Sequence, residues 1–148
     1  MRRTLGLASA LLLIALVAVS CASAAASPAA QPTSANQQSA TGTSRLVSAE
    51  ELSKAIEKKD FVLVNVHTPY AGEVDGTDLF IPSDQIGADL TKLPKDKGAK
   101  IVLYCRSGAM SAIAAKTLVG AGYTNVLELK GGMEAWKDAG YQIVERSR

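Results

Sequence analysis

The sequence predicts an α/β fold built on one mostly parallel sheet. Short apolar runs rich in Val, Ile and Leu occur at residues 61–66, 100–104 and 125–129. Continuous runs of this kind are typical of strands that are covered on both faces. The segments between them carry helix signals, and strands that alternate with helices are joined by right-handed crossovers and pair in parallel.

A helix is predicted immediately before the first of these strands. Ser48 and Glu51 have the spacing of a capping box, in which each side chain accepts a hydrogen bond from the backbone N–H of the other residue. Leu52 and Ile56, with Val47 just before the helix, form an apolar stripe, so the helix is expected to continue to about Lys59.

The later elements follow from turn residues and from apolar spacing. Prolines and glycines interrupt residues 68–82, which are therefore expected to form a loop. Gly122 follows an Ala-rich segment and is placed at C′, the left-handed position just beyond a helix. The remaining predicted elements are a short helix at 86–93, a helix at 111–121, a short helix at 132–139 and a last short strand at 142–144.

Composition favours one globular domain and excludes several classes of protein. The chain has 148 residues, 47% of them hydrophobic and 20% charged, with a net charge of +2, and such a chain is too apolar to stay disordered throughout. All 14 acidic residues lie at Glu50 or later, and beyond residue 20 the charges balance, so no basic surface for nucleic acid is expected. Two cysteines and one histidine provide neither a disulfide framework nor metal-ligand spacing, and no metal or other cofactor is predicted.

Residues 1–20 are predicted to be a signal peptide. Two arginines precede an uncharged, mostly apolar run of 15 residues, Leu5–Val19. This run matches a signal-peptide core and is shorter than a membrane-spanning helix, which needs about 20 residues. Cys21 then resembles the lipidated Cys of bacterial lipoproteins, although Ala18 stands where Leu is usual. Cleavage after residues 22–24 without a lipid is the alternative.

These features predict an exported protein of a bacterial cell envelope. A lipid on Cys21 would anchor it to the membrane, on the outer side of the cytoplasmic membrane or in the periplasm. Residues 21–44 are rich in Ala, Ser, Thr and Gln and contain no charged residue and no Leu, Ile or Val, so they are expected to form a disordered tether. Residues 45–148 are then the folded domain.

The main candidate for chemistry is Cys105, which directly follows a predicted buried strand. In such folds the sites lie at the carboxyl ends of the strands. A loop of small residues leads from Cys105 to a predicted helix, so that successive backbone N–H groups and the helix start can hold an anion. A thiol at the entrance of this loop is expected to ionise readily and to act as a nucleophile, with Arg106 adding positive charge. An inert, buried Cys at a strand end is the alternative.

Residues 63–69, 101–108 and 129–136 resemble the rhodanese domain, a sulfurtransferase fold. The resemblance implies a single domain with a five-stranded parallel sheet and helices on both faces. It also implies that Cys105 accepts sulfane sulfur from a donor such as thiosulfate or a persulfide, becomes a persulfide, and passes the sulfur to a thiol or cyanide. The residues expected to bind the substrate are Arg106, Ser107, Gly108, Ala109, Met110 and Ser111.

Several positions depart from the pattern of many family members. Asn65 and His67 replace an Asp and an Arg, Glu73 replaces a His, and Met110 stands where thiosulfate-handling loops carry a second Arg. Met cannot replace the bidentate contact of a guanidinium with an oxyanion, so thiosulfate is expected to bind less well than a persulfide of low charge. His67 is either a base near Cys105 or, as we favour, a polar residue in the vacated Arg position.

Two other classes of function stay open. A phosphatase or arsenate reductase also holds a Cys in an anion loop, but phosphatases of this kind need an Arg six positions later, where this chain has Ser111. The other is a non-catalytic rhodanese-like module that binds a partner at the cell surface, although the presence of Cys105 favours catalysis. If Cys21 is lipidated, Cys105 is the only free thiol, so any reductant or resolving thiol protein must be another molecule.

Overall fold

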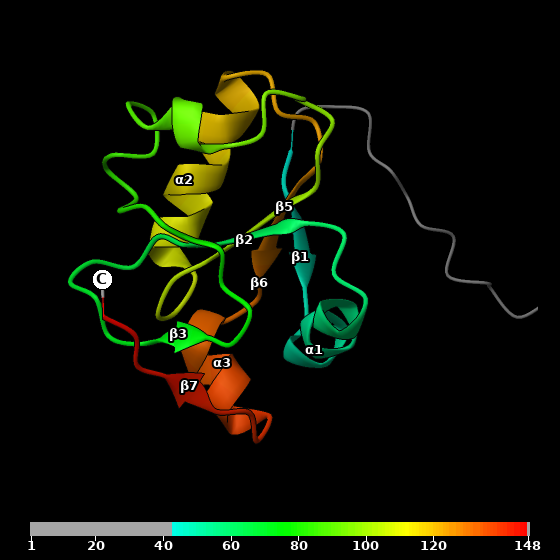
Figure 1. The fold of residues 1–148 in the computed structure, drawn as a ribbon, viewed down its shortest axis with the longest axis vertical. Helices are drawn as coiled ribbons and strands as arrows, with labels where there is room; N and C mark the ends of the chain where they lie inside the picture. The colour runs from blue at the N-terminus through cyan, green and yellow to red at the C-terminus, as the bar shows by residue number, and fades with distance from the viewer. Residues whose placement is uncertain (1–42, 148) are drawn as a thin grey trace, which may run out of the picture. The chain divides into compact units, whose positions relative to one another are not determined.

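The computed structural model describes residues 43–147. The predicted signal peptide, Cys21 and nearly all of the predicted tether lie outside these residues. None of the helices in the described part is long and apolar enough to span a membrane. Its elements are, in order, β1 (Arg45–Val47), α1 (Ala49–Glu57), β2 (Val62–Asn65), β3 (Glu73–Val74), β4 (Leu79–Phe80), the 3-10 helix η1 (Leu90–Lys92), β5 (Ile101–Tyr104), α2 (Ala109–Gly120), β6 (Val126–Leu129), α3 (Gly132–Asp138) and β7 (Ile143–Val144) (Figure 1).

Five of the strands form one sheet in the order β1-β6-β5-β2-β4. Every neighbouring pair in this sheet is parallel, which confirms the predicted fold class. The register places Asn65 of β2 beside Tyr104 of β5. The residues that follow these two strands, among them His67 and Cys105, therefore emerge at the same edge of the sheet.

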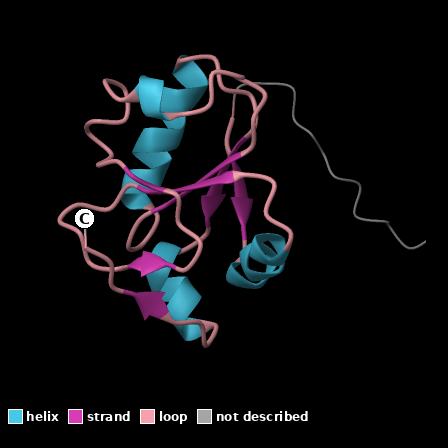
Figure 2. Cartoon of the chain, in the orientation of Figure 1, coloured by secondary structure: helices cyan, strands magenta, loops and turns pink. Residues whose placement is uncertain are grey.

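Helices cover both faces of this sheet (Figure 2). One face, which includes Leu103, packs against α2 and the segment 86–93. The other face, which includes Val102, packs against α1 and α3. Successive residues of a strand point to opposite faces, so a strand covered on both sides needs apolar residues at every position. Cys105 belongs to the cluster on the α2 face.

The predicted helix ends are confirmed where their capping signals are strong. Ser48 Oγ accepts a hydrogen bond from the Glu51 N–H, and the Glu51 carboxylate accepts one from the Ser48 N–H at 2.8 Å. Gly122 has a φ of +91°, and the N–H groups of Gly122 and Tyr123 donate to carbonyls in the last turn of α2. This is the Schellman arrangement that glycine at C′ favours.

The interpretation of the first half of the domain missed three short strands. Val47 packs with Leu52 and Ile56 as expected but lies in β1, which was not predicted, and residues 68–82 contain the strands β3 and β4 rather than loop alone. β1 and β4 are the edge strands of the main sheet and have only three and two residues. A strand of two or three residues is too short to show an alternation of apolar and polar residues. Its conformation is determined by pairing with a longer neighbouring strand.

One interpretation of the second half was also wrong. Residues 86–93 form turns that lead into the 3-10 helix η1, not a short α-helix. A segment this short, enclosed by Pro82 and Pro94 and containing Gly87, cannot offset the cost of helix nucleation. The predicted last short strand is confirmed as β7, which pairs antiparallel with β3 in a separate two-stranded sheet.

Candidate active site

Cys105 directly follows β5, as predicted, and the residue is only 2% exposed. The backbone N–H of Gly108 donates a hydrogen bond to Cys105 Sγ at 3.1 Å. Ser111 Oγ lies 4.0 Å from the same sulfur and donates to the carbonyl of Gly108 at 2.9 Å. An N–H group that points at sulfur stabilises a thiolate or a persulfide anion more than a neutral thiol.

The loop that follows Cys105 is shorter than predicted. Helix α2 begins at Ala109 rather than at Ser111, so Ala109 and Met110 belong to its first turn and not to the loop. Gly108 is the N-cap and has a φ of +104°, a conformation that glycine adopts without steric cost. Because the first N–H groups of a helix have no partners within the helix, this turn supplies donors to the predicted anion site.

The predicted substrate-binding residues differ in their exposure. Those exposed are Arg106, Ser107 and Ala109; those half-buried are Gly108 and Met110; and Ser111 is buried. Met110 packs against the apolar cluster that includes Cys105. Arg106 Nε forms an ion pair with Glu134 Oε1 of α3 at 2.9 Å. The positive charge predicted at the rim is therefore present but partly neutralised.

The start of α3 holds the Cys105 loop from the other side. The N–H of Met133 donates to the Cys105 carbonyl at 2.9 Å, and the N–H of Glu134 donates to the Arg106 carbonyl at 3.0 Å. Gly132, with a φ of +60°, permits this approach, because a Cβ there would lie 2.3 Å from the Cys105 carbonyl oxygen. Gly132 lies within residues 129–136, which carry the resemblance described above, but no local signal in the sequence indicates this role.

Asn65 and His67 lie beside this loop, at the end of β2. Asn65 is buried; its amide donates to the Gly72 carbonyl at 3.1 Å, and its Oδ1 accepts the His67 N–H at 3.0 Å. His67 Nδ1 is buried and has no hydrogen-bond partner among residues 43–147. Burial, and then the charge of Arg106, lower the pKa of His67. Its imidazole is therefore neutral near pH 7.

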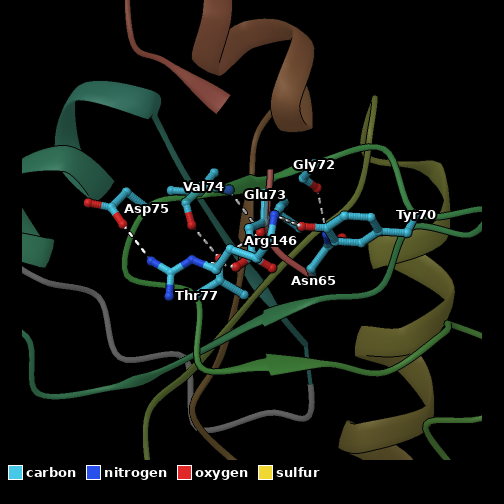
Figure 3. A network of polar contacts seen from close by, with 9 residues as sticks. Asn65, Tyr70, Gly72, Glu73, Val74, Asp75, Thr77 and Arg146 are labelled. Atoms are coloured by element: carbon cyan, nitrogen blue, oxygen red, sulfur yellow. Dashed lines mark hydrogen bonds and ion pairs between the residues drawn. The ribbon is translucent and has the colours of Figure 1, made fainter. Parts of the chain in front are cut away.

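Glu73 belongs to a polar network that the sequence interpretation missed (Figure 3). This buried side chain faces Arg146, whose Nε lies 3.0 Å from Glu73 Oε1. Arg146 Nη2 also lies 2.8 Å from Asp75 Oδ1, and its backbone N–H donates to the Tyr70 hydroxyl at 3.1 Å. These contacts fasten β7 to β3 across a large separation in sequence, for which no local motif gives a signal.

Tyr104 connects the β3 segment to the strand that ends at Cys105. Its hydroxyl accepts the Val74 N–H at 3.0 Å and lies 2.6 Å from Thr77 Oγ1. Thr77 Oγ1 donates its only proton to the Val74 carbonyl, so the Tyr104 hydroxyl donates to Thr77. Burial raises the pKa of Tyr104 far above its usual range. The hydroxyl therefore stays protonated and keeps its hydrogen bond to Thr77 Oγ1.

Met133 and Trp136 of α3 are core residues rather than parts of a ligand site. Both are buried in the cluster under α1 and α3. Trp136 Nε1 donates to the Gln142 carbonyl at 3.0 Å, which satisfies the one polar group of the ring. Within residues 43–147 no three side chains of His, Cys, Asp or Glu are grouped so that they could hold a metal ion.

The chain is similar to several known proteins. A family profile described as Rhodanese-like domain matches residues 48–139. A protein named sulfurtransferase from Allochromatium vinosum is 37% identical over 101 residues, which cover 66% of this chain and 92% of that protein. The probable adenylyltransferase/sulfurtransferase MoeZ of Mycobacterium tuberculosis is 37% identical over 83 residues, which cover 53% of this chain but only 20% of MoeZ.

A solved structure has the same architecture. The crystal structure of a rhodanese-like domain protein from Staphylococcus aureus superposes with a TM-score of 0.56 and 28% sequence identity. The match covers 68% of this chain and 99% of that chain. The five-stranded parallel sheet with helices on both faces agrees with this group of structures.

Proposed function

Because the chain belongs to the rhodanese-like domain family, we propose that it is a sulfurtransferase that carries sulfane sulfur on Cys105. Relatives named sulfurtransferase support sulfur transfer as the general activity of this domain. The donor in this proposal is thiosulfate or a persulfide, and the acceptor is a thiol or cyanide.

The reaction has two displacement steps at sulfur. The Cys105 thiolate bonds to the sulfane sulfur of the donor, the bond between that sulfur and the rest of the donor breaks, and sulfite leaves thiosulfate with the bonding electron pair. An acceptor thiolate then bonds to the outer sulfur of the Cys105 persulfide. The S–S bond breaks and returns its electron pair to Cys105. The sum of both steps needs no outside oxidant or reductant.

The observation that supports this proposal most is the hydrogen bond from the Gly108 N–H to Cys105 Sγ at 3.1 Å. It combines with the free N–H groups in the first turn of α2, which begins at Ala109. Together they supply donors for the negative charge that sulfur carries before, during and after the transfer. Ser111 occupies the position where a phosphatase of this kind needs an Arg, and a hydroxyl cannot replace that cation.

The test is to load the full chain with sulfur and to replace Cys105. Wild type incubated with thiosulfate or with an organic persulfide should gain the mass of one sulfur atom on Cys105. Cys105→Ser should lose both the added sulfur and all turnover, because an alcohol cannot form a persulfide. Cys21→Ser is the matched control and should behave as wild type. Turnover that persists in Cys105→Ser would contradict the proposal.

Met110 is proposed to set the preference between donors. Met110→Arg would restore a second cation beside the first turn of α2. One charge-assisted hydrogen bond contributes about 1.5–3 kcal/mol, so thiosulfate turnover should rise about tenfold to a hundredfold if the cation acts in the transition state. A persulfide donor of low charge should gain much less. Equal gains for both donors, or none for thiosulfate, would show that residue 110 does not face the donor.

A rhodanese-like module that only binds a partner is the second candidate. The 2% exposure of Cys105 is the observation that favours it, since a nucleophile must be reached by its donor. Absence of added sulfur on Cys105 with both kinds of donor, in a chain that is folded, would establish this candidate over the first.

The protein is further proposed to be exported and anchored by a lipid on Cys21. The support is the apolar run Leu5–Val19, the small residues before Cys21 and the uncharged segment after it. Mass analysis of the mature N-terminus should show a lipid-modified Cys21. A chain that begins at Ala25 without a lipid would contradict anchoring and leave a secreted, unanchored domain.

A further inference from the structure

The strands of the main sheet are parallel, so they all begin at one edge of the sheet and end at the other. Cys105 follows the end of β5, and a cavity of about 410 Å³, whose lining includes His67 and Lys137, lies on that side. The opposite edge, which we call the amino edge, consists of residues 43–45, 93–100 and 121–125 at the starts of β1, β5 and β6 (Figure 1). The chain before residue 43 is therefore joined to the domain at the edge opposite Cys105.

Residues 93–100 have a fixed position on the amino edge, because hydrogen bonds fasten them to the segment before β6. The Tyr123 hydroxyl donates to the Pro94 carbonyl at 2.8 Å. The Thr124 N–H donates to the Lys97 carbonyl at 2.9 Å. Lys97 Nζ also lies 3.7 Å from the centre of the Tyr123 ring, a cation–π contact. The backbone of this segment therefore has little conformational entropy to lose when it contacts a partner.

The exposed charges of the amino edge are mainly positive. Three exposed cations of this edge form no ion pair within residues 43–147, namely Arg45, Lys95 and Lys97. Asp96 is the one acidic residue in the three segments, and its Oδ1 accepts the Gly98 N–H at 2.8 Å. Lys100 is neutralised by an ion pair with Asp60 at 2.7 Å. Three cations against one carboxylate leave this edge with a positive excess, which attracts an anionic surface.

An exposed apolar side chain accompanies these cations. Leu46 is next to Arg45 in the edge strand β1 and is 58% exposed, which is high for a large apolar residue. Basic side chains beside an apolar one fit the surface of a lipid bilayer. Anionic headgroups attract the basic groups, and the boundary with the acyl chains accepts the apolar group.

We propose that the amino edge is a docking surface for an anionic lipid bilayer and that the Cys105 edge faces away from the membrane. The inference rests on the lipid anchor proposed above, not on sulfur transfer. A lipid on Cys21 keeps the domain close to the bilayer, so that even a few cations suffice for contact, because the contact is then intramolecular. In this orientation the sulfur donor and the acceptor reach Cys105 from the aqueous side.

The experiment attaches the full chain to vesicles through Cys21 and measures which lysines are covered. The Cys105→Ser variant has Cys21 as its one remaining thiol, and a maleimide lipid in the vesicle takes the place of the natural anchor. One set of vesicles contains phosphatidylcholine alone, and the other also contains about 30% phosphatidylglycerol, which makes the surface anionic. Mass spectrometry then gives the rate of acetylation of each lysine.

Lys95 and Lys97 should react about threefold more slowly on the anionic vesicles than on the neutral ones, because the headgroups cover them. Lys130 and Lys137 are internal controls. They follow β6 and lie in α3, are exposed, and also form no ion pair within residues 43–147. Their rates should be the same on both kinds of vesicle. About 0.5 M KCl should remove the protection, because it shortens the Debye length to a few ångströms.

Two double variants locate the effect. Arg45→Glu combined with Lys95→Glu should abolish the protection of Lys97, because the edge then carries a negative excess. Lys130→Glu combined with Lys137→Glu changes the net charge by the same amount on the other side of the sheet and should leave that protection intact.

Each remaining outcome overturns the inference. Equal rates for Lys97 on both kinds of vesicle would show that the amino edge does not contact the bilayer. Slower acetylation of Lys130 and Lys137 instead would place the Cys105 edge against the membrane. Stronger protection of Lys97 by soluble poly-glutamate than by vesicles would assign the edge to an acidic protein partner.

These outcomes are distinct from failure of the proposed function or of the proposed anchor. Cys105→Ser carries no sulfur, so the rates of acetylation do not depend on sulfur transfer. The attachment through Cys21 is made chemically, so they do not depend on lipidation in the cell. Mass analysis of the mature N-terminus, described above, tests the natural anchor by itself.

Discussion

The Cys105 loop and the small β3–β7 sheet border the same cavity, yet different interactions hold them. The loop is held by backbone hydrogen bonds from the start of α3 and by close packing against Gly132. The β3–β7 pair is held by the long side chain of Arg146, which reaches buried Glu73 and exposed Asp75. Backbone contact leaves no room for an added atom, whereas a half-exposed ion pair is adaptable and screened by water. The loop is therefore expected to be the region more sensitive to substitution.

The largest effect is expected from Gly132→Ala. A Cβ at this position would lie 2.3 Å from the Cys105 carbonyl oxygen and 2.7 Å from the Arg106 carbonyl oxygen, in a residue with a φ of +60°. Overpacking and backbone strain together should lower the free energy of unfolding by about 3 kcal/mol or more and abolish sulfur transfer. Urea denaturation and turnover measure both effects.

Gly140→Ala is the matched control for that variant. Gly140 ends α3 with a φ of +87°, and nothing lies within 4 Å of a Cβ built there. Only the backbone strain remains, which costs about 1–2 kcal/mol. If Gly132→Ala destabilised no more than Gly140→Ala, close packing at the Cys105 loop would not be the constraint that the structure indicates.

The next effect is expected from Arg146→Gln, which breaks the charge network of the β3–β7 sheet. Glu73 is fully buried, so the loss of its cation is costly, although Arg146 itself is half exposed and screened. We expect the free energy of unfolding to fall by about 2–3 kcal/mol, at the low end of values for buried pairs. Asp75→Asn removes only the exposed partner and should cost at most about 1 kcal/mol. Equal losses in the two variants would place the stabilisation on Asp75 instead.

Tyr104→Phe tests the connection between the two regions. It leaves the buried Val74 N–H without its partner, which should cost about 1–2 kcal/mol. Because Tyr104 precedes Cys105, sulfur transfer should fall as well. Tyr123→Phe removes a partly buried hydroxyl that donates to the Pro94 carbonyl at 2.8 Å and has no contact with the β3 segment. It should lower stability without lowering turnover. If Tyr104→Phe kept wild-type turnover while Tyr123→Phe lost it, Tyr104 would not connect the β3 segment to the site.

The smallest effect is expected from pH at His67. Its pKa is lowered from 6.5 in the folded protein by burial and by Arg106, so the unfolded chain binds a proton first as pH falls. Stability should be full above pH 6.5 and decline below it, until the lower folded pKa is passed. Between pH 8 and about pH 5, the urea midpoint of His67→Gln should fall less than that of wild type, because the variant has no imidazole to protonate. Identical pH profiles for both proteins would contradict the lowered pKa.

The site could be predicted in part because its signals are local. Cys105 at the end of an apolar strand, followed by small residues and a helix, is visible within a few residues of sequence. The start of α2 was misplaced by two residues, which moved Ala109 and Met110 from the loop to the helix. The cavity lined by His67 and Lys137 could not be predicted, because its lining residues come from segments that are far apart in the sequence and meet only in the folded chain.

By itself the sequence determined the alternation of buried strands and helices, the N-cap of α1, the glycine that ends α2, and the place of Cys105 after β5. Each of these depends on propensity or spacing within one element. Only the tertiary structure decided the short edge strands β1 and β4, the separate β3–β7 sheet and the partner of Glu73. Glu73 and Arg146 have 72 residues between them and meet only after the chain has folded. Their ion pair therefore depends on closing a long loop, and no local pattern in the sequence can indicate it.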